Sequence, residues 1–158
     1  MTAGPTMPVE RIASEQVTTI LAQVHDQWVE RIGELLAPAT LQTSSFWDRW
    51  GAVRFLADQF EDRFRLECEL AECLSGRLSP TCRARLAATR TGLDRTREAL
   101  MEAGRRQGSA PQVVLLARRL LDQVRRWCVT LELAATGVDR EDLSPRAREV
   151  LGRLRTAA

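Results

Sequence analysis

The sequence predicts an all-α protein, an antiparallel up-down four-helix bundle followed by a short fifth helix at the C-terminus. Apolar residues recur at three- and four-residue steps along almost the whole chain, and the alternating or β-branched runs of strands are absent. Turn signals containing glycine, serine and proline divide this pattern into long helical segments. A chain of 158 residues with 44% apolar content is long enough for one domain with a hydrophobic core.

The first two bundle helices are predicted from their apolar stripes and from the residues that bound them. Residues 9–36 follow a flexible N-terminus at residues 1–8, and Pro38 cannot continue the first helix. Residues 45–75 form the second helix, which serines cap at its start and Gly76 ends. The core stripes are Val17, Ile20, Leu21, Val24, Trp28, Ile32 and Leu35 in the first helix, and Phe46, Trp50, Val53, Ala57, Phe60, Phe64, Cys68, Ala71 and Leu74 in the second.

The remaining helices follow from two Ser-Pro starts and one clear turn. Ser79 and Pro80 are typical of an N-cap and a first helical residue, so the third helix is predicted over about residues 80–106. The turn QGSAPQ separates it from a fourth helix at 111–136, and the segment 137–158 holds a linker and a short helix. Short connections make neighbouring helices antiparallel. The stripe of the fourth helix is Val113, Ala117, Leu120, Val124, Trp127, Leu131 and Ala134.

Aromatic residues at the start of the second helix are a candidate partner-binding surface. Trp47 leaves the core stripe beside Arg49, whereas Trp50 lies on the stripe. An antiparallel first helix would place Trp28 at the level of Val53, so the tryptophans and Phe46 should gather at one end of the bundle. Such a cluster is either a plug at the end of the core or an anchor for a partner. The candidate partner-binding residues are Trp47, Arg49, Arg54 and Trp28.

The charge is divided unequally between the two halves of the chain. Residues 1–76 hold six arginines and twelve carboxylates, a formal charge of −6, whereas residues 77–158 hold seventeen and nine, a charge of +8. One interpretation is that acidic helices pack against basic ones within the bundle. The alternative is an exposed basic patch for phosphates or an acidic protein surface. Its candidates are Arg118, Arg119, Arg125, Arg126, Arg83, Arg90 and Arg97.

Nucleic acid is a weaker expectation than a protein partner. The whole chain carries a formal charge of only +2, and no aromatic platform for stacking bases accompanies the arginines. The sequence also lacks the turn of a helix-turn-helix motif and the spacing of a zinc finger.

No pattern typical of an enzyme or a cofactor site is found. His25 is the only histidine, and it has no metal-ligating companion at three or four residues along the first helix. It is more typical of a hydrogen-bonded packing residue. Neither G-x-S-x-G nor a glycine-rich phosphate loop occurs. We therefore expect no catalytic residue, no metal and no cofactor.

Four cysteines are expected to be reduced thiols. Their spacing matches no familiar zinc pattern. Cys68 and Cys128 are expected to be small buried hydrophobes at one level of the bundle. Cys73 and Cys82 flank the second turn, and whether they form a disulfide stays open.

The sequence favours a bacterial, cytoplasmic protein. The N-terminus does not resemble a secretory signal, and no run is long enough to span a membrane. All 23 basic residues are arginine, a bias that GC-rich genomes produce. The function expected is a non-enzymatic helical interaction module, a small accessory or assembly subunit that binds a protein partner or itself through helix faces. The alternatives are a helical subunit that contacts nucleic-acid backbone and a bundle with an apolar pocket for a small ligand.

Overall fold

The predicted all-α bundle is confirmed by a computed structural model of the chain. The structure describes Gly4 and residues 15–37, 45–106 and 110–157, without the side chains at positions 46, 47 and 110. Within these residues the regular elements are helical throughout. They are the α-helices α1 (Val17–Leu35), α3 (Phe46–Leu74), α4 (Pro80–Arg105), α5 (Ala110–Ala134) and α6 (Pro145–Thr156), and the 3₁₀ turns η1 (Ser75–Arg77) and η2 (Arg140–Asp142).

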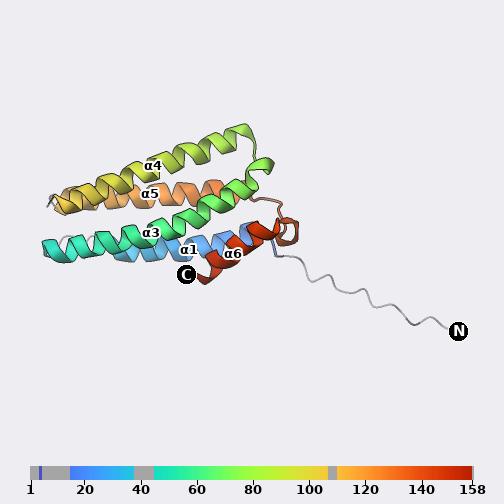
Figure 1. The fold of residues 1–158 in the computed structure, drawn as a ribbon, viewed down its shortest axis with the longest axis horizontal. Coiled ribbons are helices and arrows are strands. Elements are labelled where there is room, and N and C mark those ends of the chain that lie inside the picture. Colours follow the sequence, from blue (N-terminus) through green and yellow to red (C-terminus); the bar gives the residue numbers. More distant parts are fainter. Residues whose placement is uncertain (1–3, 5–14, 38–44, 107–109, 158) are drawn as a thin grey trace.

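The four long helices lie side by side and run alternately up and down (Figure 1). Helix α5 packs between α4 and α1, and α3 packs against α4, so each long helix has a neighbour on either side. Helix α6 lies across α3 and α1 and covers part of the side where these two helices meet. The side shared by α1 and α3 is therefore the one that the short C-terminal helix closes.

Serine caps start three of the helices where the sequence predicts them. The Ser45 hydroxyl accepts a hydrogen bond from the amide of Asp48 at 3.3 Å, and Ser79 accepts one from Cys82 at 3.1 Å. Ser144 caps α6 in the same way. Each cap satisfies an amide that the helix itself leaves unpaired and contributes about 1 kcal/mol.

Helix α1 begins later than the predicted boundary at residue 9. Gln16 has extended backbone, and the amide of Val17 donates to the carbonyl of Val138 at 3.0 Å. The amide of Arg140 donates to the carbonyl of Glu15 at 3.1 Å. These two bonds hold the chain before α1 against the linker before α6, which stops the helix at Val17. The predicted helical residues 9–14, and all of the expected flexible N-terminus except Gly4, lie outside the described residues.

The described residues of the predicted stripes form the core or pack against it, whereas the Phe46 side chain lies outside the described structure. The register between α1 and α3 differs from the predicted one. Trp28 stacks on Phe60 with ring centroids 5.7 Å apart, seven residues further along α3 than Val53. Trp50 packs instead on Gly104 of α4, where a Cβ atom would lie only 2.9 Å from its ring. The expected cluster of Trp28 with Trp50 at one end of the bundle is therefore wrong. A shift of seven residues moves Trp28 about 10 Å along α3.

Candidate interaction surface and the buried charge network

A charged residue lies at the centre of the core on α3. Residues 53, 60, 67 and 74 follow one another at seven-residue steps, and at this spacing they share the core face of the helix. Three of the four are apolar, whereas the fourth is Glu67, with 0% of its side chain exposed. A carboxylate at this depth costs several kcal/mol of desolvation unless charged partners surround it.

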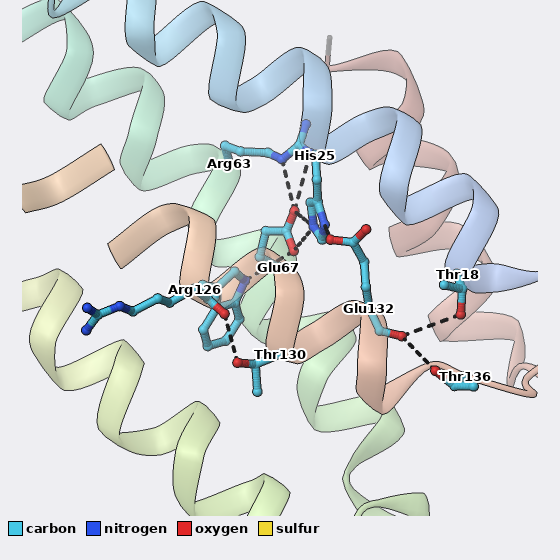
Figure 2. A network of polar contacts seen from close by, with 9 residues as sticks. Thr18, His25, Arg63, Glu67, Arg126, Thr130, Glu132 and Thr136 are labelled. Atoms are coloured by element: carbon cyan, nitrogen blue, oxygen red, sulfur yellow. Dashed lines mark hydrogen bonds and ion pairs between the residues drawn. The ribbon is translucent and has the colours of Figure 1, made fainter. Parts of the chain in front are cut away.

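His25 of α1 supplies the first partner and lies between two carboxylates (Figure 2). Its Nε2 atom is 2.9 Å and 3.0 Å from the two carboxylate oxygens of Glu67, and its Nδ1 atom is 3.1 Å from Oε2 of Glu132 on α5. Carboxylate oxygens accept hydrogen bonds, so each ring nitrogen must carry a proton to satisfy this geometry. The arrangement fits the imidazolium cation better than either neutral tautomer.

Arg63 is the second cation. Its Nε and Nη2 atoms donate to Oε1 of Glu67 at 3.4 Å and 3.3 Å, and Nη1 donates to the carbonyl of Leu154 on α6 at 3.3 Å. The guanidinium carbon lies 5.1 Å from the ring centroid of Trp28, a cation–π contact. On the other side, Nε1 of Trp127 donates to Oε2 of Glu67 at 3.3 Å. The network therefore joins α1, α3, α5 and α6.

The charges of this network balance when His25 is protonated. Burial alone would lower the pKa of His25, but the hydrogen bonds and charges of Glu67 and Glu132 outweigh burial and raise the pKa above its usual value. Burial likewise favours the neutral form of Glu67, and His25 and Arg63 outweigh it and lower the pKa. Two cations then face two anions, which is the condition for placing such groups in a core.

Sequence reasoning missed Arg63, Glu67 and Glu132 as parts of one site. The predicted stripe of the second helix ran through Phe64 and Cys68, which are indeed buried, and left out the charged residues beside them. The seven-residue series through Phe60 and Leu74 was the available signal, because it passes through position 67. His25 is a hydrogen-bonded packing residue, as the sequence indicated.

The His25 ring and two of the four thiols are buried. Only 2% of His25 is exposed, and both of its ring nitrogens are engaged by carboxylates. Burial raises the pKa of the Cys68 thiol to about 11 and raises that of Cys128 as well, so these buried thiols stay protonated. Cys73 is exposed and Cys82 is half-buried, and neither is in a disulfide. Across the described ranges, no cluster of three or more His, Cys, Asp or Glu side chains is arranged to hold a metal ion.

The candidate partner-binding residues whose side chains the structure describes do not share one exposed surface. Trp28 is only 7% exposed, because it lies between Phe60 and Arg63, so it is a core residue and not a surface anchor. Arg54 is exposed and Arg49 is half-buried on α3. The side chain of Trp47 lies outside the described part of the structure.

The candidate basic patch divides into two sets on different sides of the bundle. Arg90 and Arg97 of α4 face α3, where they lie 4.0 Å and 3.8 Å from Glu72 and Glu61. These pairs match the interpretation of acidic and basic flanks within one bundle, although pairs this exposed contribute little to stability. Arg83 is exposed near the start of α4. The other set, on α5, is exposed: Arg118, Arg119, Arg125 and Arg126.

The α5 arginines share their side of the helix with three large apolar side chains. Leu115 is 61% exposed, Val129 57% and Leu133 65%. Spacings of fourteen and four residues place all three within a narrow sector of an ideal helix, and the four arginines and Asp122 fall beside them. We call this set the α5 face: Leu115, Arg118, Arg119, Asp122, Arg125, Arg126, Val129 and Leu133.

The comparisons with known proteins give no relative from which a role could be taken. Searches with the chain against family models, curated sequences and solved structures find no match. A separate property of the described helices is that none has the length and apolar character needed to cross a membrane.

Proposed function

We propose that this protein is a non-enzymatic helical interaction module, a small accessory or assembly subunit, and that its α5 face binds an acidic protein surface. The observation that carries the proposal is the exposure of Leu115, Val129 and Leu133 among four arginines on one helix. The α5 face has four positive charges against one carboxylate. Apolar anchors flanked by arginine are typical of protein interfaces, in which arginine is enriched.

The exposed aliphatic side chains favour a protein over a nucleic acid. The phosphates of a nucleic acid can pair with arginines, but they offer leucine and valine no apolar contact. An amphipathic protein helix can contact the arginines and the apolar side chains together. The apolar residues lie at both ends of the arginine cluster, so a partner helix of similar length would reach all of them.

Charge also disfavours a second copy as the occupant of the α5 face. A symmetric dimer through α5 would bring the arginine cluster of one copy against that of the other. Like charges placed together across an interface cost several kcal/mol.

Four unpaired cysteines suit a reducing compartment, and the proposal places the module in the cytoplasm.

Site-specific photo-crosslinking in the source cell tests this proposal. A photoreactive amino acid at position 129 is expected to capture one protein whose crosslinked segment is acidic and contains exposed apolar residues. The matched control is position 55, because Phe55 is also a large exposed apolar residue, 48% exposed, but lies on α3. The yield from position 129 should fall at least tenfold when Arg125 and Arg126 are both replaced by glutamate.

Four results would contradict the proposal. Crosslinks from position 129 to nucleic acid would favour the backbone-binding alternative, and crosslinks to a second copy would favour self-association. Equal capture from positions 55 and 129, or capture that survives the charge reversal, would show that the α5 face is not selective.

A further inference from the structure

Helix α5 is apolar on two opposite sides. The buried stripe that faces the bundle consists of Val113, Ala117, Leu120, Val124 and Leu131. Leu115, Val129 and Leu133 lie on the opposite side of an ideal helix, away from the core. Phe55 of α3 is the one other large apolar side chain that is exposed in the part of the chain that the structure describes. A helix with a second apolar side is typical of one that packs against a further element there.

The α5 face is arranged almost symmetrically about Asp122. Arginines lie at three and at four residues on either side of Asp122, and a large apolar residue lies at seven on either side. On an ideal helix, Asp122 and the apolar residues form one line with a row of arginines on each flank. The rows are Arg118 with Arg125 and Arg119 with Arg126.

Most of the arginine charge on this face is available to a partner. Asp122 pairs with Arg125 at 3.6 Å, and both side chains are largely exposed. The other three arginines of the face have no ion-pair partner among the described residues. A complementary surface therefore has carboxylates at its centre and apolar side chains at its ends.

The spacing of the apolar residues favours a helix as the complementary element. Leu115, Asp122 and Val129 follow one another at seven-residue steps, which is the spacing of the seam between two helices that run side by side. The line from Leu115 to Leu133 is about 27 Å long, or five turns. A helix along this line satisfies its own backbone hydrogen bonds, whereas an extended strand on a helix surface would leave backbone groups unpaired.

We propose that the partner contributes an α-helix of about 20 residues that lies along α5, with apolar residues at both ends of the contact and carboxylates between them. This inference rests on the proposed function and specifies the element and the pattern that the α5 face recognises. The partner helix places apolar side chains on Leu115 at one end and on Val129 and Leu133 at the other. Because the face is nearly symmetric about Asp122, the same pattern fits a parallel and an antiparallel helix.

Crosslinking from two positions of the full-length protein in the source cell measures the spacing of the partner's contact residues. Photoreactive amino acids placed separately at positions 115 and 129 lie about 21 Å apart along α5. For a helix that lies along α5, the two crosslinked residues of the partner should be about 14 positions apart, since a helix rises about 1.5 Å per residue. An extended segment would give about 6 positions, since a strand rises about 3.4 Å per residue.

A designed peptide tests the pattern with the purified full-length protein. It is a hydrocarbon-stapled, fluorescein-labelled helix with leucine at seven residues and glutamate at three and four residues on either side of its centre. Fluorescence anisotropy should show binding, and one glutamine inserted at the centre should weaken binding at least tenfold. The insertion keeps the charge and the apolar content but turns the two halves about 100° apart, so both leucines can no longer face α5 together.

Substitutions on the protein locate the peptide. The variant L115S/V129S removes the apolar residue at each end of the symmetric pattern and should weaken binding at least tenfold. The control F55S removes an equally exposed type of side chain from α3, and it should leave binding within twofold.

The helix proposal is overturned if the crosslinks have the spacing of an extended segment, or if positions 115 and 129 reach separate segments of the partner. It is also overturned if the insertion peptide binds as tightly as the original, if F55S weakens binding as much as L115S/V129S, or if no binding is detected at millimolar protein. In each case the proposed function still stands when position 129 captures an acidic partner, whereas a lack of capture at position 129 contradicts both.

Discussion

Replacing Glu67 by glutamine is expected to lower the free energy of unfolding by about 3–5 kcal/mol, the usual cost of removing one partner from a buried ion pair. Glutamine has nearly the same size, so packing is kept while the charge is lost. His25 and Arg63 then share the core with only the partly exposed Glu132 as a counter-ion. Since small domains have a total stability of about 5–15 kcal/mol, this variant should be close to the limit of folding. Urea denaturation followed by circular dichroism at pH 6 measures the effect.

The matched control is Glu61→Gln, the same change six residues earlier on α3. Glu61 is exposed and lies 3.8 Å from Arg97, so its loss should cost less than about 1 kcal/mol. A Glu67→Gln protein whose stability lies within 1 kcal/mol of wild type would show that the network is not charged or not important for the fold.

The second large effect expected is a loss of stability as the pH rises above neutrality. The folded-state pKa of His25 is raised above 6.5, so its contribution is complete below pH 6.5 and disappears as the pH passes through the folded value. The pKa of Glu67 is lowered below 4.5, so its contribution is complete above pH 4.5 and disappears as the pH falls through the folded value. Stability should therefore be highest between about pH 4.5 and 6.5.

Urea denaturation at a series of pH values from 4 to 8 checks this dependence. One proton that the folded state keeps and the unfolded state has lost lowers the free energy of unfolding by at most about 1.4 kcal/mol per pH unit. The groups facing His25 are Glu67 and Glu132, with Arg63 on the far side of Glu67. The variant His25→Gln cannot take up this proton, so its alkaline decline should be nearly absent. A wild-type protein equally stable at pH 6 and pH 8 would contradict the prediction.

The helices were predictable because their signals are local. Serine caps, the Ser-Pro starts and one turn mark the ends, and apolar spacing marks the faces that become the core. The start of α1 was not predictable in this way. Gln16 leaves the helix because the backbone around it pairs with Val138 and Arg140, more than a hundred residues away in sequence.

The register of α1 on α3 and the nature of the core were not predictable from apolar spacing. Trp28 lies on Phe60 because the pairing of His25 with Glu67 sets the two helices in that position. A search for apolar residues excludes both partners of such a pair. The α5 arginines were found from their charge, whereas Leu115, Val129 and Leu133 were not, since exposure depends on how the helices are arranged.

The interpretation as a non-enzymatic module depends on His25 being a fixed structural cation rather than a base that substrates can reach. Nuclear magnetic resonance of the ring nitrogens tests this directly, and the single histidine makes the assignment unambiguous. At pH 6.5 both Nδ1 and Nε2 are predicted to be protonated, with slow exchange of both protons and a titration midpoint above 6.5. A neutral tautomer at that pH, or ring protons that exchange as fast as those of an exposed histidine, would contradict the account.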